Sequence, residues 1–262
     1  MNIKSLLAGA LFALTLFTTP ALVRADDPPV AAKADAKPVT IVRTYKVGDS
    51  HRYSTLIRAN VGGMEGVING AQKIVVKEIK KDGSVVLTQE AEESKMEFGG
   101  NVQNQPATKP SSETRDKFGK LIDYAPSEDA MSPWTPEIQK LMTSISEVIL
   151  NGKEVKAGES WETELINPAV KDKTFKVKTT YVGTEKVEDV EYLKVEQNIS
   201  VEVDDTGTKM TIKSVQWLKP SDGSLFKSLA TIKGLPTTFG SLDMDQTFKL
   251  AKPEEKKEKS DK

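Results

Sequence analysis

Most of the chain between residues 39 and 251 alternates apolar and polar side chains with a period of two. In one segment, Phe175 and Val177 alternate with Lys176 and Lys178. Successive side chains of a β-strand point to opposite faces, so this alternation predicts strands with one buried face. We expect about eleven strands, near 41–46, 51–60, 72–80, 84–98, 118–125, 161–166, 174–185, 191–203, 208–218, 225–233 and 244–250.

Turn residues separate these runs. Lys81-Asp82-Gly83, Asp204 to Gly207 and Pro220 to Gly223 each place a glycine where a hairpin needs a positive φ. Short turns between amphipathic strands indicate an antiparallel meander. The segment from Gly99 to Ser112 is rich in Gly, Asn, Gln and Pro, and we expect a long polar loop there.

One segment, about 136–150, switches to helical spacing. Its apolar residues form a single stripe at intervals of three and four positions: Ile138, Leu141, Met142, Ile145, Val148 and Ile149. Thr135 is a suitable N-cap, Pro136 suits the first helical position, and Glu137 suits the positive end of the helix dipole. Asn151-Gly152 provides a stop signal.

The helix is the one large amphipathic element available to cover the sheet. The predicted fold is therefore mainly β (α+β): an antiparallel meander curled into a half-open barrel of about eleven strands, with the helix on its concave face. An apolar concavity under such a helix can hold a greasy ligand. The alternative is that the helix and the side chains fill the interior completely.

A short pattern is repeated on either side of the helix. Lys46 to His51 resembles Lys156 to Trp161, and Gly119 to Ile122 resembles Gly223 to Phe226. The residues 39–251 therefore form either one β-rich domain or two duplicated halves, about 39–130 and 151–251, joined by the helix. Chance reuse of common turns is the alternative explanation.

The first 25 residues have the three parts of a secretory signal peptide. A basic start at Lys4 precedes an apolar run from Leu6 to Phe17, and Val23-Arg24-Ala25 predicts cleavage after Ala25. We expect residues 26–38 to form a disordered leader and residues 252–262 a disordered charged tail. The mature protein is then exported to a periplasm or beyond, in soluble form.

Composition excludes several classes of function. The chain has no cysteine, which excludes disulfides, thiolate metal sites and the acylated cysteine of a lipoprotein, so we expect no membrane anchor. Removal of Lys4 and Arg24 leaves 35 basic residues (37 minus 2) against 38 acidic ones, a net charge of −3. This near balance provides no strongly basic field for a nucleic acid or an anionic membrane.

Catalytic and metal-binding patterns are weak. His51 is the one histidine, so any histidine base must use it, but no Gly-x-Ser-x-Gly motif accompanies it. One histidine without cysteine cannot build a typical zinc site. The pairs Asp204-Asp205 and Asp243-x-Asp245 lack the spacing of a calcium loop, and hairpin-tip aspartates usually make turns. We expect no catalytic residues, no metal and no cofactor.

Four stretches carry a resemblance to a family of uncharacterised exported bacterial β-rich proteins. They are Val47 to Tyr53 (VGDS…Y), Ala157 to Trp161 (AGESW), Phe175 to Glu196, and Trp217 to Ser228. The likeness covers most of the mature chain, and the family has no assigned activity. At the level of fold, Trp217 leading into Asp222-Gly223 also resembles periplasmic lipoprotein-carrier half-barrels, which hold acyl chains.

Two functions remain open. The first is a non-enzymatic protein that binds or carries an apolar ligand such as a lipid or acyl chain, with the helix-stripe residues Ile138, Leu141, Met142, Ile145 and Ile149 as candidate contacts. The second is an envelope structural or protein-interaction module that binds a protein partner through its strand edges. A cell-wall polymer hydrolase built on paired carboxylates is a third.

Overall fold

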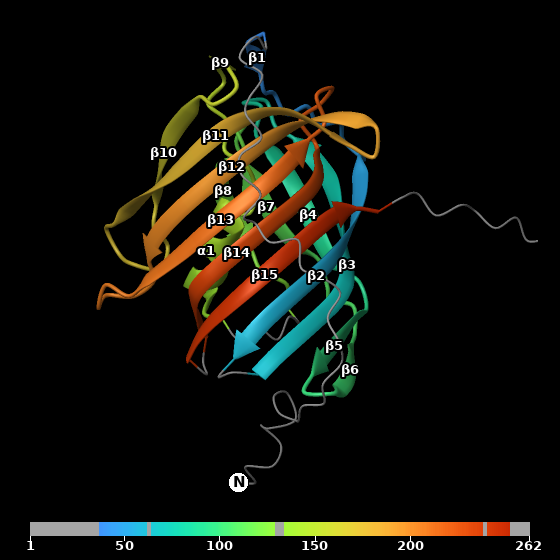
Figure 1. The fold of residues 1–262 in the computed structure, drawn as a ribbon, viewed down its shortest axis with the longest axis vertical. Helices are drawn as coiled ribbons and strands as arrows, with labels where there is room; N and C mark the ends of the chain where they lie inside the picture. The colour runs from blue at the N-terminus through green and yellow to red at the C-terminus, as the bar shows by residue number, and fades with distance from the viewer. Residues whose placement is uncertain (1–36, 62–63, 129–133, 238–239, 252–262) are drawn as a thin grey trace, which may run out of the picture.

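The computed structural model describes residues 37–61, 64–128, 134–237 and 240–251 (Figure 1). The predicted cleavage site at Ala25, most of the leader and the charged tail lie outside the described residues. No helix in the described ranges is long and apolar enough to cross a membrane.

The described chain is mostly strand, with one α-helix, α1 (Pro136–Ile145). The strands are β1 (Val39–Thr40), β2 (Ser50–Val61), β3 (Met64–Ile79), β4 (Val85–Ala91), β5 (Ser94–Phe98), β6 (Asn101–Gln105), β7 (Ser111–Arg115), β8 (Leu121–Ala125), β9 (Glu154–Val155), β10 (Ser160–Ile166), β11 (Thr174–Val187), β12 (Val190–Glu202), β13 (Lys209–Leu218), β14 (Leu225–Thr237) and β15 (Gly240–Leu250).

Thirteen strands form one antiparallel sheet in the order β10-β11-β12-β13-β14-β15-β2-β3-β4-β7-β8, to which β5 and β6 are added beside β3. β10 and β8 end this order without pairing to each other, so the sheet curls but does not close (Figure 1). The predicted half-open antiparallel barrel is confirmed. β1 and β9 form a separate two-stranded pair.

The main core lies between α1 and the concave face of β10 to β15. Because paired residues share a face, the register Val177↔Ile199↔Ile212↔Ile232↔Met244 traces one apolar row across five strands. The helix packs on this row with Ile138, Leu141 and Ile145, and Figure 1 shows α1 behind β13 and β14.

The polar segment 99–112 is not the loop that its composition predicts. It contains β6 and the start of β7. β6 pairs with β5 through a hairpin at Gly99-Gly100, which have φ values of 56° and 79°. All five residues of β6 are exposed, so the strand carries no alternation for a sequence pattern to detect.

Two other expected strands are also wrong. The expected strand 41–46 is irregular, because Ile41 is buried against the interior and Thr44 N–H donates to the Asp222 carbonyl at 2.9 Å in place of a ladder bond. The expected strand 84–98 is two strands, because β4 pairs with the second half of β3 and β5 with the first half.

The helix begins where the sequence predicts and ends earlier. The Thr135 side chain accepts from Ile138 N–H at 3.4 Å, and Pro136 opens the helix. The helix stops at Ile145 instead of near 150, so Asn151-Gly152 is not its stop signal. Beyond it, Trp161 Nε1–H donates to the Ile149 carbonyl and Leu150 N–H donates to the Phe118 carbonyl, both at 2.9 Å, in place of helical bonds.

The two repeated turns have the same hydrogen bonds to the neighbouring strand. Gly48 N–H donates to the Val76 carbonyl at 2.9 Å, and Gly158 N–H donates to the Tyr181 carbonyl at 2.7 Å. Each strand has a register irregularity directly after the bonded residue, at Val76/Glu78 and at Tyr181/Gly183. The two turns therefore occupy equivalent places, and duplication of the halves stays a prediction.

Leu141→Ala should lower the free energy of unfolding by about 3 kcal/mol, because Leu141 is fully buried between α1 and the sheet and its loss leaves a cavity. Urea unfolding followed by circular dichroism measures the change. Lys140→Ala, at an exposed position of the same helix, is the control. Equal midpoints for the two variants would contradict the packing of α1 onto the sheet.

Candidate functional site

The concave face of β10 to β15 is filled by the helix. Ile138, Leu141, Ile145 and Ile149 are each 6% exposed or less and belong to the main core, and Met142 is half-buried against it. These predicted contact residues are therefore brought together, but as packed core. A ligand would reach them only if α1 moved.

The apolar concave face continues beyond the part that α1 covers. Ile57 on β2 pairs with Ile68 on β3, and Ile68 pairs with Met96 on β5. Ile57 packs against the main core. Ile68 and Met96 are half-buried and belong to none of the core clusters found among the described residues.

A second apolar row runs beside the first. Gly66 on β3 lies between Ala59 on β2 and Phe98 on β5. The Phe98 ring lies so close to Gly66 that a Cβ there would come within 2.7 Å of a ring carbon. These two rows on β2, β3 and β5 are called the concave apolar rows below. Within them, Ile68, Met96 and Phe98 are half-buried and belong to none of the core clusters of the described residues.

A buried ionic network lies where the chain leaves α1. Arg115 on β7 is fully buried and donates through Nη2 to Glu113 Oε2 at 2.7 Å and to the Thr143 carbonyl at 2.7 Å. Arg43 forms an ion pair with Glu147 Oε2, which also lies 3.7 Å from Arg115 Nε. Two arginines and two glutamates thus balance each other inside the protein.

Burial and the neighbouring charges shift the pKa values of the ionisable groups in and around this network. Burial alone would raise the pKa of Glu147, but Arg43 and Arg115 outweigh it and hold that pKa below its usual value. Burial, with a smaller effect of Glu147, raises the pKa of Tyr45 to about 12, and the same causes raise the pKa of Tyr53. At neutral pH the carboxylate is charged and both phenols are neutral, which suits a structural network better than an acid catalyst.

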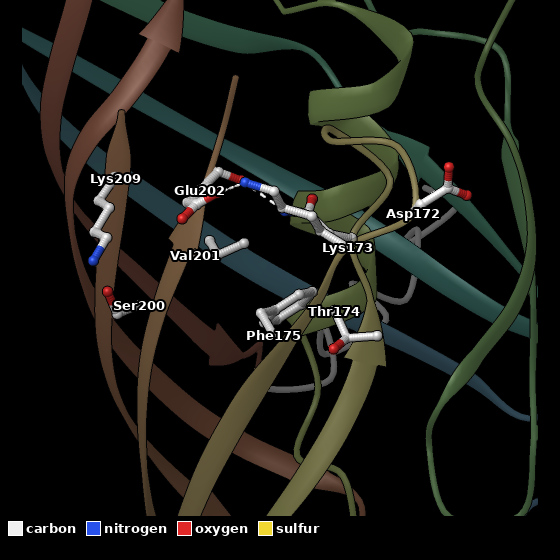
Figure 2. Close-up of a pocket in the computed structure, with 9 residues that line it drawn as sticks. Asp172, Lys173, Thr174, Phe175, Ser200, Val201, Glu202 and Lys209 are labelled. Carbon is white, nitrogen blue, oxygen red and sulfur yellow. Dashed lines mark hydrogen bonds and ion pairs between the residues drawn. The ribbon is translucent and has the colours of Figure 1, made fainter. Parts of the chain in front are cut away.

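A shallow polar pocket of about 430 Å³ lies between the β10–β11 connection and the β12–β13 hairpin (Figure 2). Lys173 and Glu202 form an ion pair across it. Its buried Asn167 is already satisfied, because Nδ2 donates to the Glu202 carbonyl at 2.8 Å and Oδ1 accepts from Ala169 N–H at 2.9 Å. Lys173 and Glu202 are paired with each other and the buried amide is occupied, so we assign this pocket no ligand.

The other residues singled out in the sequence lie apart from one another. His51 is half-buried at the start of β2, with its ring 6.4 Å from that of Tyr53. Asp204 accepts from Thr206 and Thr208 in its hairpin turn, and Asp245 accepts from Thr231 Oγ1 at 2.6 Å. In the part of the chain that the structure describes, no group of three His, Cys, Asp or Glu could hold a metal ion.

Sequence reasoning missed both the ionic network and the concave apolar rows. Glu113 and Arg115 lie on one face of a short polar strand, directly after the expected loop and before the next expected strand, and the same pattern also describes an exposed strand. Ile68 lies before the expected start of its strand at residue 72. The signal that could have found it is the alternation from Gly66 to Gly70, in which Ile68 shares a face with two glycines that obscure the apolar pattern.

No family model and no curated protein matches this chain. Among solved structures it is similar to the hypothetical lipoprotein YmcC from Escherichia coli, with a TM-score of 0.28 and 12% identity over 78% of this chain and 85% of that one. It is also similar to DynF from the dynemicin biosynthesis pathway of Micromonospora chersina (TM-score 0.22, 10% identity, 90% of this chain and 95% of that one).

A third similar structure is a DUF1329 family protein from Desulfovibrio piger, with a TM-score of 0.15 and 9% identity over 77% of this chain and 84% of that one. With TM-scores this low, none of the three carries an argument about what this chain binds or does.

Glu147→Gln should lower the free energy of unfolding by about 3 kcal/mol at pH 7, because it leaves Arg43 buried without its carboxylate. The folded-state pKa of Glu147 lies below its unfolded value, so its contribution is complete above the unfolded pKa and is lost as pH falls through the folded one. The difference from wild type should therefore shrink between about pH 5 and pH 3.

Urea unfolding at several pH values measures this difference. Glu128→Gln is the matched control, because Glu128 is 82% exposed in its ion pair with Lys109. A deficit in Glu147→Gln that stays constant as the pH falls would show that the carboxylate charge does not stabilise the fold.

Proposed function

We propose that this chain is an exported, non-enzymatic protein that binds or carries an apolar ligand such as a lipid or acyl chain. The observation that carries the proposal is the set of concave apolar rows on β2, β3 and β5. Ile57, Ile68 and Met96 extend the apolar surface of the core past the helix. Binding of an apolar ligand over such a half-buried surface removes it from water and is therefore favourable.

The shape of this surface suits a chain-like ligand. The rows cross three strands in register, and the absence of a side chain at Gly66 lets the Phe98 ring approach β3 closely. α1 forms a wall beside the rows, since Ile57 and Ala59 contact the same core that the helix packs against. The ligand therefore lies beside the helix rather than beneath it.

Other features support a binding role over catalysis. The buried carboxylate Glu147 has its pKa lowered by two arginines, whereas a glycoside hydrolase needs a carboxyl group with a raised pKa. The predicted signal peptide supports export. A hydrolase therefore gains no support from the geometry of the described residues.

Ile68→Gln should weaken binding of a fluorescent fatty-acid probe by about tenfold or more, because burial of an isoleucine side chain contributes about 1.5–3 kcal/mol. Val67→Gln is the matched control, since Val67 is also half-buried but lies on the opposite face of the same strand. Fluorescence titration measures both dissociation constants.

Native mass spectrometry of the protein purified from the periplasm should show a lipid that dissociates at higher collision energy. A repeatedly clean apo mass, together with equal probe affinities in the two variants, would overturn the carrier proposal.

The open sheet supports a second candidate, an envelope protein-interaction module. In the described chain, β8 and β10 end the main strand order of the sheet, and Ile166 at the end of β10 is 75% exposed. Unpaired strand edges can add a partner's strand. Cross-linking in the native organism should then recover a stable protein partner through β8 or β10, and a monodisperse monomer without cross-links would contradict it.

A further inference from the structure

The convex face of the sheet carries a row of three lysines and one tryptophan. Lys194 on β12 pairs with Trp217 on β13, Trp217 pairs with Lys227 on β14, and Lys227 pairs with Lys249 on β15. Paired residues share a face and lie about 5 Å apart at Cβ. Lys194 and Lys227 thus place their ammonium groups near the indole, and Lys249 places its own 5.8 Å from the ring centroid of Phe226. All three lie on the face opposite to the concave apolar rows.

An aromatic cluster holds the indole in place. Tyr192 and Phe226 are stacked with their ring centroids 4.2 Å apart, and they form a buried cluster with Trp217. Lys227 Nζ lies 5.0 Å and Lys194 Nζ 5.6 Å from the Trp217 ring centroid. The position of the indole ring is therefore fixed by packing, whereas the lysine side chains that lie over it are flexible.

Two donors in this row lack an acceptor. Trp217 is 6% exposed, and its Nε1–H has no hydrogen-bond partner in the described part of the protein. Lys227, directly across from it, makes no ion pair with any described residue. A buried N–H without an acceptor is costly, and lysines that pair directly across strands repel each other. Both costs fall when one anion accepts from Trp217 and Lys227.

The charge count specifies the anion. Lys194 pairs with Glu185 at 2.8 Å, and Lys249 pairs with Glu188 at 2.5 Å. These pairs leave the charge of Lys227 uncompensated. The matching ligand is a monoanion with several acceptor oxygens, which describes a phosphate diester or a singly protonated phosphate group.

We propose that Trp217 and Lys227 bind a phosphate group on the convex face, with Lys194 and Lys249 adding attraction at longer range. The group belongs either to a free phosphate ion or to a phospholipid headgroup. Lys227 must swing away from the indole to admit it, which a four-carbon side chain does at low cost. The site is independent of the concave apolar rows, so it stands or falls separately from the carrier proposal.

The test uses the full mature chain with two probes. Sodium phosphate is titrated by calorimetry, and vesicles of phosphatidylcholine with and without phosphatidylglycerol are tested by co-sedimentation. Lys227→Gln should weaken binding at least about tenfold, and Trp217→Phe, which keeps an aromatic ring and removes the N–H, should weaken it severalfold. Lys213→Gln, an exposed lysine on the same face of β13, is the control and should bind within about twofold of wild type.

The two probes distinguish the sources. Binding of sodium phosphate that depends on Lys227 supports the site with a free ion, and Lys227-dependent binding to phosphatidylglycerol vesicles alone supports it with a headgroup. If Trp217→Phe does not fold, the indole N–H resonance of Trp217 in the wild-type protein must still shift on addition of the bound probe. Failure to bind either probe, or an equal loss in Lys213→Gln, overturns the proposal.

Discussion

The ionic network of Arg43, Arg115, Glu113 and Glu147 joins three parts of the chain that no strand pairing connects. Arg43 comes from the segment before β2, Glu113 and Arg115 from β7, and Glu147 from the turn after α1. Each charge is too costly to bury alone, so the partners must be placed together or the fold loses several kcal/mol. The network therefore fixes where the helix leaves the interior, and the covered part of the concave face depends on it.

The network occupies positions where the other half of the sheet has uncharged residues. Val85 pairs with Arg115 as Leu193 pairs with Leu218, and Leu87 pairs with Glu113 as Val195 pairs with Gln216. The interior positions are thus uncharged in one half of the sheet, and in the other half they hold a charge pair. Buried ion pairs often contribute more to the specificity of a fold than to its stability. Here the charge pair places Arg115 on β7, where it contacts the end of the helix.

The sequence predicted the elements whose own pattern is strong. Alternation located β10 to β15, and the Thr135 cap with the apolar stripe located the start of α1. The sequence pattern failed at β6, whose residues are all exposed and carry no alternation. It also failed at the end of α1, where Glu147 pairs with Arg43 and Arg115, two residues that are distant in the sequence. Site prediction was weaker still, since the expected contacts on the helix became core and the concave apolar rows depend on the pairing of β5 with β3, which no local pattern encodes.

The position at which α1 ends also decides which part of the concave face it covers. Residues 146–150 leave the helical path, so the Ile149 carbonyl accepts from Trp161 Nε1–H and Leu150 N–H donates to the Phe118 carbonyl. The helix and this segment are thereby held over β10 to β15, and the rows through Ile57 and Ile68 are left half-buried. A helix continuing to residue 150 would lose these contacts and the ion pairs of Glu147. The segment that carries Glu147 therefore holds α1 over β10 to β15, beside the concave apolar rows.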